Sequence, residues 1–193
     1  MNEANILDTP TVHSEIERKS KEIGFTMPSD VFIGTLLKTL ISSKPAGRFL
    51  ELGTGIGLSL SWMVDGMDVN SSLITVDNDP KLIEIAQHYF GTDTRVDIDC
   101  EDGTSWIKTN KEENFDLIFA DAWPGKYSDI DEILAMVNVG GFYIIDDMNA
   151  QPNWPEGHDK FVETLVSYLE NRTDFNISKM NWSTGLIVAV KIK

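Results

Sequence analysis

The final stretch of the chain restricts the fold more than any other part of the sequence. Two segments with an apolar alternation, Phe175–Trp182 and Leu186–Ile192, are separated only by Ser183, Thr184 and Gly185. A link this short cannot hold a crossover helix, so the two predicted strands must be antiparallel. Any sheet that contains them is therefore mixed, which argues against a plain dinucleotide-binding domain with a wholly parallel sheet.

Upstream of this hairpin, strand and helix patterns alternate. Short apolar or alternating runs predict strands at Arg48–Gly53, Leu73–Asp77, Arg95–Cys100, Phe115–Ala120 and Phe142–Ile145. Helical patterns follow them at Ser59–Val64, Asp79–Phe90, Gly103–Thr109, Ile130–Val137 and Lys160–Asn171. Five βα units and a terminal hairpin predict an α/β, Rossmann-like, doubly wound mixed sheet of seven strands.

The residues before the first strand predict two further helices. His13–Ile23 is charged and weakly amphipathic, whereas Pro28–Ile41 has a wide apolar face. A length of 193 residues favours one domain. We therefore expect a single domain over residues 1–193, with residues 1–27 as an N-terminal extension and residues 28–193 as the core.

The charge of the chain excludes several classes of partner. The formal net charge is −15, and so acidic a surface repels phosphate backbones and anionic lipid, which argues against nucleic acids and membranes. No apolar run is long enough to span a bilayer, and the first ten residues lack a signal-peptide pattern. The single cysteine, Cys100, rules out an intramolecular disulfide. A cytoplasmic location is the expectation.

Acidic residues stand at the exit of every predicted parallel strand. In open α/β sheets, ligands bind beyond the carboxyl ends of the strands, so these side chains should share one crevice. One alternative is that they cap the helices that follow, as Asp79 is expected to do before Pro80. The acidic residues are Glu51, Asp77, Asp102, Asp121, Asp146 and Asp147.

The first of these exits is a glycine loop, Gly53–Gly57. Glycines there allow a sharp turn and a close approach to a ligand. The dinucleotide fingerprint G-x-G-x-x-G is not met, because Leu58 stands where its third glycine would fall. Asp77 lies at the end of the second strand, where a carboxylate can accept from both hydroxyls of a ribose. A carboxylate-lined pocket suits a cationic sulfonium cofactor better than an anionic dinucleotide.

Several segments resemble, in order and spacing, the motifs of class I S-adenosylmethionine-dependent methyltransferases. They are FLELGTGIGLS (Phe49–Ser59), ITVDNDP (Ile74–Pro80), EDG (Glu101–Gly103), FDLIFADAWPGKY (Phe115–Tyr127) and GGFYIIDD (Gly140–Asp147). Within that class the chain resembles the small catechol and caffeoyl-coenzyme A O-methyltransferases. The resemblance covers roughly Met27–Lys193.

The resemblance implies a cofactor site built from these motifs. Glu51 and Ser59 would hold the amino and carboxylate groups of the methionyl part, and Asp77 would hold the ribose. Asp102 would meet the adenine edge, and Trp123 would pack on the adenine. The full implied cofactor set is Glu51, Gly53, Thr54, Gly55, Ser59, Asp77, Asn78, Asp102, Gly103, Asp121 and Trp123.

The resemblance also implies a metal site. Relatives hold a Mg²⁺-type ion with an Asp after the fourth strand and an Asp-Asn pair after the fifth. Asp121 and Asp146 match two of these positions, and Asp147 replaces the Asn. All-oxygen ligands suit Mg²⁺ or another hard divalent cation. The alternatives are that Asp147 points away or that Lys126 neutralises the carboxylates.

The general base of the catechol enzyme has no direct counterpart here. That enzyme uses a lysine three residues after the metal-binding Asp, and Pro124 stands at that position. Lys126 is the nearest lysine, so we predict Asp121 and Lys126 as the catalytic pair. His158 is a rival base.

The predicted reaction is in-line methyl transfer to a small-molecule acceptor, for which Trp154 and Met148 make an aromatic or apolar character plausible. Three alternatives remain open: an N-methyltransferase on the same fold, a non-catalytic protein that binds S-adenosylmethionine or a nucleoside, and a nicotinamide oxidoreductase. Related small enzymes are often dimers, so a homodimer is a further expectation.

Overall fold

The computed structural model describes residues 2–6, 8–152 and 154–193. Met1, Leu7 and Asn153, which belong to the predicted domain, lie outside the described residues. The strands are β1 (Arg48–Leu52), β2 (Ser72–Asp77), β3 (Val96–Cys100), β4 (Phe115–Ala120), β5 (Val137–Ile145), β6 (Phe175–Met180) and β7 (Leu186–Lys191). The helices are α1 (His13–Ile23), α2 (Val31–Ser42), α3 (Leu58–Gly66), α4 (Pro80–Phe90), α5 (Gly103–Thr109), α6 (Ile130–Ala135) and α7 (His158–Glu170).

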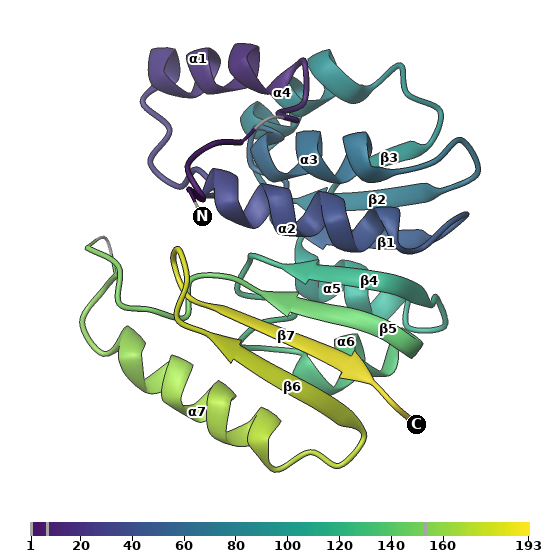
Figure 1. The fold of residues 1–193 in the computed structure, drawn as a ribbon, viewed down its shortest axis with the longest axis vertical. Coiled ribbons are helices and arrows are strands. Elements are labelled where there is room, and N and C mark those ends of the chain that lie inside the picture. Colours follow the sequence, from purple (N-terminus) through teal and green to yellow (C-terminus); the bar gives the residue numbers. More distant parts are fainter. Residues whose placement is uncertain (1, 7, 153) are drawn as a thin grey trace.

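The described strands form one seven-stranded sheet in the order β3-β2-β1-β4-β5-β7-β6 (Figure 1). β1 to β5 pair in parallel, whereas β7 pairs antiparallel with both β5 and β6. The predicted fold class is confirmed, including the closing hairpin. The order reverses between β1 and β4, which is where an open α/β sheet places its ligand crevice.

The start of β5 is the boundary that differs most from its prediction. The helical pattern was expected to run to Val137 and to end before Gly140 and Gly141, but α6 ends at Ala135 and Val137 already begins β5. The register between β4 and β5 shifts after Phe115, which leaves the glycines in an irregular part of the strand. Gly140 takes φ +80° there, a conformation that glycine tolerates inside a bulged strand.

Apolar side chains fill both faces of the sheet because successive residues of a strand point to opposite sides. Leu50 and Leu52 pack in a core with residues of α5, α6 and α7. Phe49 belongs to the opposite core, which contains residues of α1, α2, α3 and α4. Glu51 alternates in the same way as Phe49, so its carboxylate points under α3 rather than along the sheet edge.

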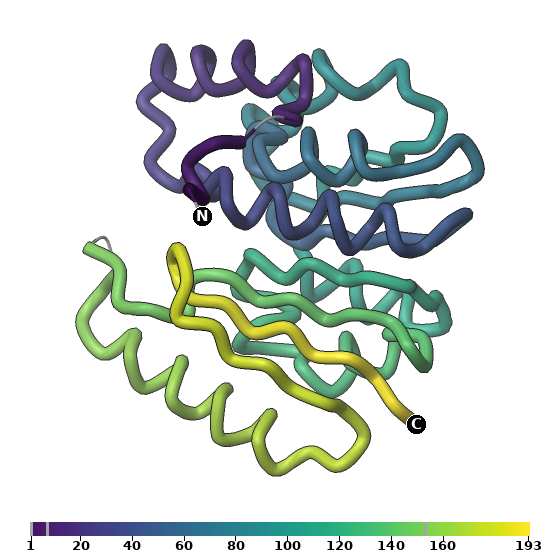
Figure 2. The backbone as a smooth tube through the Cα atoms, viewed as in Figure 1, coloured from purple at the N-terminus to yellow at the C-terminus, as the bar shows by residue number. Residues whose placement is uncertain are grey.

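Segments from distant parts of the sequence meet at the carboxyl ends of the parallel strands. Figure 2 shows the N-terminal segment and the β6–β7 turn reaching this same end of the molecule. The indole Nε1 of Trp182 donates to the Glu3 carboxylate at 3.1 Å. On the α1 side, His13 Nδ1 and Ser61 Oγ are 3.0 Å apart. Among the described residues, no helix has the length and apolar character needed to cross a membrane.

Candidate functional site

The strand ends surround a cavity of about 1030 Å³. This is at the upper end of the volumes typical of small-molecule sites, roughly 300–1,000 Å³. Every predicted site residue except Glu51 lines it. These lining residues are Gly53, Thr54, Gly55, Ser59, Asp77, Asn78, Asp102, Gly103, Asp121, Trp123, Lys126, Asp146 and Asp147.

The glycine loop forms one wall of the cavity and depends on its glycines. Gly53 has φ +104°, and a Cβ on it would lie 2.7 Å from the backbone oxygen of Asp121. No side chain fits at that distance, so only glycine lets β1 and β4 exit side by side here. Gly57, at φ +93°, is the N-cap residue of α3. The third glycine therefore opens the helix, one residue earlier than the dinucleotide pattern would place it.

Asp77 fastens the glycine loop to the end of β2. Its Oδ2 accepts from the Gly55 N–H at 2.8 Å, and its Oδ1 accepts from the Asp79 N–H at 3.0 Å. A carboxylate has about four lone-pair positions, so two remain for a ligand in the cavity. The two backbone bonds fix the orientation of the carboxylate before any ligand arrives. The role of Asp77 as the ribose acceptor stays a prediction.

Glu51 lies beneath the loop instead of on the cavity surface. Its side chain is fully buried, and it accepts hydrogen bonds from Ser59 Oγ at 2.5 Å and Thr75 Oγ1 at 2.6 Å. Thr54 Oγ1 extends this network, 2.6 Å from Thr75 Oγ1. Burial raises the pKa of Glu51 to about 7. In this arrangement Glu51 orients Ser59, which does line the cavity.

Glu51 should make the stability of the protein depend on pH. The fold raises its pKa from 4.5 to about 7. Below about pH 4.5 the carboxyl is protonated in both states and the folded protein keeps its full stability, which falls as pH rises towards 7 because ionisation favours the unfolded chain. Glu51→Gln removes this pH-dependent loss of stability, because glutamine does not ionise. Relative to the wild type, the variant should gain up to roughly 3 kcal/mol between about pH 5 and about pH 8, measured by urea unfolding. If the difference in unfolding free energy between variant and wild type were the same at both pH values, the raised pKa of Glu51 would be contradicted.

Some of the acidic residues at the strand ends are helix N-caps, and this role does not exclude binding of a ligand in the cavity. Asp79 accepts from the Lys81 N–H at 2.8 Å, which confirms the predicted N-cap of α4. Asp102 likewise accepts from the Ser105 N–H at 2.9 Å and caps α5. Asp102 also lines the cavity. A cap carboxylate retains further lone pairs, so the two roles are compatible.

The deepest charges of the cavity come from the ends of β4 and β5. Burial raises the pKa of Asp121 well above its ordinary value, and the nearby carboxylates of Asp146 and Asp147 raise it further, while Lys126 opposes them. Burial also raises the pKa of Asp146 to about 6. Ser29, just before α2, donates to Asp121 Oδ2 at 3.5 Å. The structure thus brings the predicted Asp121, Asp146 and Lys126 together.

The three predicted metal ligands do not form a metal-binding group. Among the described residues, no cluster of three His, Cys, Asp or Glu side chains is placed to hold an ion. Asp146 Oδ1 already accepts from the Thr184 hydroxyl and from the Asp147 N–H, the latter at 2.6 Å. The oxygen donors are of the right chemical kind for Mg²⁺, but their arrangement does not fit one.

Aromatic side chains form the outer wall of the cavity. Trp123 lies with its ring centroid 4.9 Å from Tyr127 and 4.9 Å from Phe161 on α7. Trp154 lies 4.4 Å from the ring of His158, whose Nε2 is 3.1 Å from Tyr127 Oη. Tyr127, to which the sequence assigned no role, also lines the cavity, whereas Phe161 contacts Trp123 without lining it. Tyr127 lies within a motif that resembles the methyltransferases, and that was the one signal available for it.

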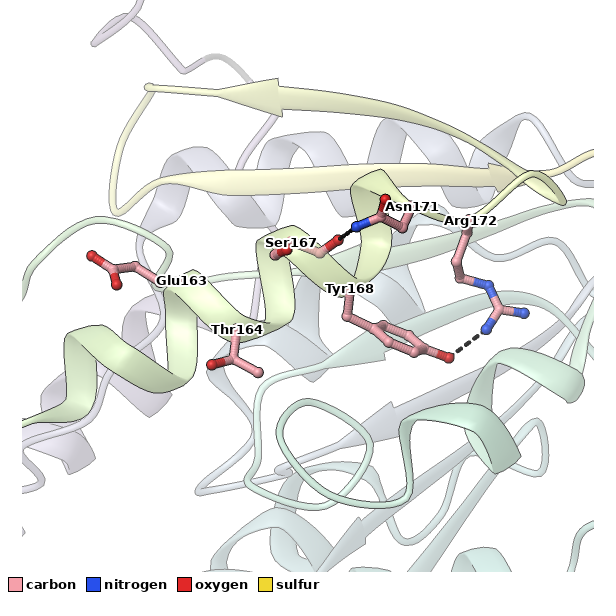
Figure 3. Close-up of a pocket in the computed structure, with 6 residues that line it drawn as sticks. All are labelled: Glu163, Thr164, Ser167, Tyr168, Asn171 and Arg172. Atoms are coloured by element: carbon pink, nitrogen blue, oxygen red, sulfur yellow. Dashed lines mark hydrogen bonds between the residues drawn. The ribbon is translucent and has the colours of Figure 1, made fainter.

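A second hollow, of about 630 Å³, lies along α7 (Figure 3). Its lining comes from the second half of α7 and the two residues that follow the helix, within residues 163–172. Its polar groups already bond one another: Asn171 Nδ2 donates to the Ser167 carbonyl at 2.7 Å, and Arg172 donates to Tyr168 Oη. It does not include the acidic strand ends, so we assign it no ligand.

Comparison with known proteins decides the family. A sequence profile described as O-methyltransferase matches residues 6–182. The chain belongs to this O-methyltransferase family. A Mycobacterium leprae protein assigned as an O-methyltransferase is 29% identical over 126 residues, which are 63% of this chain and 55% of that protein. The chain therefore spans about half the length of the curated relatives it matches.

Solved structures of methyltransferases share the fold of this chain. The O-methyltransferase from Bacillus cereus in complex with SAH has a TM-score of 0.84 at 16% identity, covering 97% of this chain and 94% of that one. The O-methyltransferase TomG from Streptomyces achromogenes, in complex with SAM, has a TM-score of 0.84 at 19% identity, with coverages of 98% and 93%. At these identities the likeness establishes the fold, including the strand order that creates the cavity.

Proposed function

We propose that the chain is an S-adenosylmethionine-dependent methyltransferase that methylates an oxygen of a small-molecule acceptor. The observation that carries the proposal is the row of carboxylates that lines one cavity at the carboxyl ends of β2 to β5. A sulfonium cofactor carries positive charge, and a cavity of this sign attracts it. Family membership and the SAM- and SAH-bound relatives support the same cofactor.

In the proposed reaction the acceptor oxygen attacks the S-methyl carbon from the side opposite sulfur. A C–O bond forms as the C–S bond breaks, and S-adenosylhomocysteine leaves as the neutral thioether. Catalysis comes mainly from holding the two reactants in line. The glycine loop, Asp77 and Asp102 would position the cofactor, and Asp121 would lie beside the reacting methyl. The acceptor would bind in the same cavity, next to the aromatic side chains of Trp123, Tyr127 and Trp154.

Two titratable side chains of the cavity wall are the candidates for taking the proton of the acceptor hydroxyl. Lys126 is the base predicted from the sequence, and it lines the cavity. His158 also lines it, and burial together with the charge of Lys126 lowers the pKa of His158. A neutral imidazole can accept a proton at neutral pH. Its hydrogen bond with Tyr127 Oη holds the ring at the cavity wall.

A divalent cation, a cytoplasmic location and a homodimer remain predictions. The carboxylates here supply suitable oxygens without forming a group placed to hold the ion. Turnover with and without EDTA measures this directly.

Calorimetric titration tests the cofactor, and an acceptor screen tests the transfer. We expect S-adenosylhomocysteine to bind and NADH not to bind, because the cavity is acidic and the glycine loop lacks the dinucleotide spacing. Tight NADH binding without a response to S-adenosylhomocysteine would refute the proposal. Binding without transfer to any hydroxyl compound in the screen would favour the non-catalytic alternative, and transfer to amines alone would favour an N-methyltransferase.

A further inference from the structure

A buried lysine stands among the carboxylates at the floor of the cavity. Lys126 is only 5% exposed, and within the described part of the chain it is the one Lys or Arg among the buried residues. Its Nζ donates to the backbone oxygen of Asp146 at 2.6 Å and lies 5.4 Å from the centroid of the Tyr127 ring. Lysine is seldom buried this far without an opposing charge.

The turn before Lys126 directs the side chain inward. Gly125 has φ +80°, and a Cβ on it would lie 2.4 Å from Leu52 Cδ1. The Gly125 N–H donates to the Ser128 carbonyl at 2.8 Å, and Tyr143 Oη donates to the Gly125 carbonyl. These contacts fix the turn against Leu52 at the end of β1. Pro124, which replaces the expected lysine, is part of the same turn.

The charges that face Lys126 come from the ends of two neighbouring strands. Asp121 follows β4, whereas Asp146 and Asp147 follow β5. The electrostatic influence of Lys126 reaches both Asp121 and Asp146. Its direct hydrogen-bond partner is a carbonyl, so its charge acts on the carboxylates through space. Asp146 and Asp147 both act on the Asp121 carboxylate, and like charges in one site repel one another unless a cation compensates them.

We infer that Lys126 is the built-in cation of this site, taking the place that an oxygen-liganded metal ion would otherwise fill. It is a positioning residue: its ammonium ties the loop after β4 to the end of β5 and balances Asp121, Asp146 and Asp147. The inference rests on the proposed function only in that these carboxylates face the bound methyl donor. An ammonium held in this role is not the base, which leaves the acceptor proton to His158.

Thermal unfolding with MgCl₂ and with EDTA tests the inference without needing an acceptor. The wild-type midpoint should respond to neither. Lys126→Met should lower the midpoint and acquire a stabilisation by millimolar Mg²⁺ of about 2–4 °C or more, because the carboxylates then lack their cation. Lys126→Arg should restore the wild-type behaviour, since arginine keeps the charge. Lys111→Met, at an exposed lysine, is the matched control and should change neither value.

Two results would overturn the inference. One is a wild-type midpoint that rises with Mg²⁺ and returns with EDTA. The other is a Lys126→Met protein that remains indifferent to Mg²⁺. If Lys126→Met does not fold, the thermal midpoints of the wild type and of Lys126→Arg test the inference instead. A site that requires a metal ion would make both midpoints rise with Mg²⁺. Where an acceptor is known, turnover by Lys126→Arg adds a second test, since arginine cannot serve as a base and loss of a base costs about 10²–10⁴-fold. Failure of the proposed function would show separately, as absence of S-adenosylhomocysteine binding to the wild type.

Discussion

An Asp77→Ala variant is expected to lose affinity for S-adenosylhomocysteine by about 100-fold or more. Hydrogen bonds to a charged group contribute about 1.5–3 kcal/mol each, and the variant removes the acceptor for two ribose hydroxyls. It also removes the two bonds that the carboxylate makes to the Gly55 and Asp79 N–H groups. The glycine loop would then be attached to β2 only through the Gly53 and Thr54 N–H groups, which donate to the Val76 carbonyl, and this weaker attachment lowers the affinity further.

Calorimetry gives the affinity, and thermal unfolding shows whether the fold survives. Asp77 is only half-buried, so the variant should unfold cooperatively near the wild-type midpoint. Asp97→Ala is the matched control, because Asp97 is an exposed carboxylate on the neighbouring strand β3. It removes the same charge from the protein without touching the cavity. Normal binding by Asp77→Ala would show that the ribose lies elsewhere and that the acidic row has another purpose.

The topology could be predicted because it follows from lengths of chain. A link of three residues permits only an antiparallel pair, and repeated strand–helix–strand units with links of this length are typical of parallel crossovers. The start of β5 could not be predicted in the same way. Val137 continues the helical spacing of Ile133 and Leu134. It belongs to the strand because it pairs with Phe115 on β4. That contact is a tertiary one, and no local pattern records it.

The site was predictable to the extent that it consists of strand ends. Parallel strands finish at one edge of a sheet, so the acids that follow them meet there. What each acid does depends on its partners across the sheet. The hydroxyls of Thr75 and Ser59 each donate to one oxygen of Glu51, and these two hydrogen bonds keep that carboxylate beneath the loop.

The far side of the cavity was less accessible to sequence reasoning. His158 reaches it only because α7 packs across the opposite face of the sheet from α3, at a long distance in sequence from Trp123 and Tyr127. Lys126 shows the same limit. Its spacing from Asp121 suggested a base, and its burial and its bond to the Asp146 carbonyl depend on how the Pro124–Gly125 turn folds.

Gly53→Ala is the second variant with a large expected effect. An alanine Cβ at this position would lie 2.7 Å from the Asp121 oxygen and 3.0 Å from its carbonyl carbon. Both are backbone atoms, so no side chain can rotate to relieve the contact. The left-handed φ of +104° adds a cost of about 1–2 kcal/mol for any residue with a Cβ. Either the glycine loop or the exit of β4 must then move, and each forms a wall of the cavity.

Gly140→Ala separates the two contributions. Gly140 also has a left-handed φ, of +80°, but a Cβ there would have no neighbour within 4 Å. Gly140→Ala should therefore lose only the conformational cost, about 1–2 kcal/mol, and should bind S-adenosylhomocysteine normally. Gly53→Ala should lose roughly 2–5 kcal/mol in urea unfolding and at least about 10-fold in S-adenosylhomocysteine affinity, because overpacking adds to the strain and displaces the cavity wall. Equal losses of stability with intact binding in both variants would mean that the approach of β1 to Asp121 is not what requires glycine at position 53.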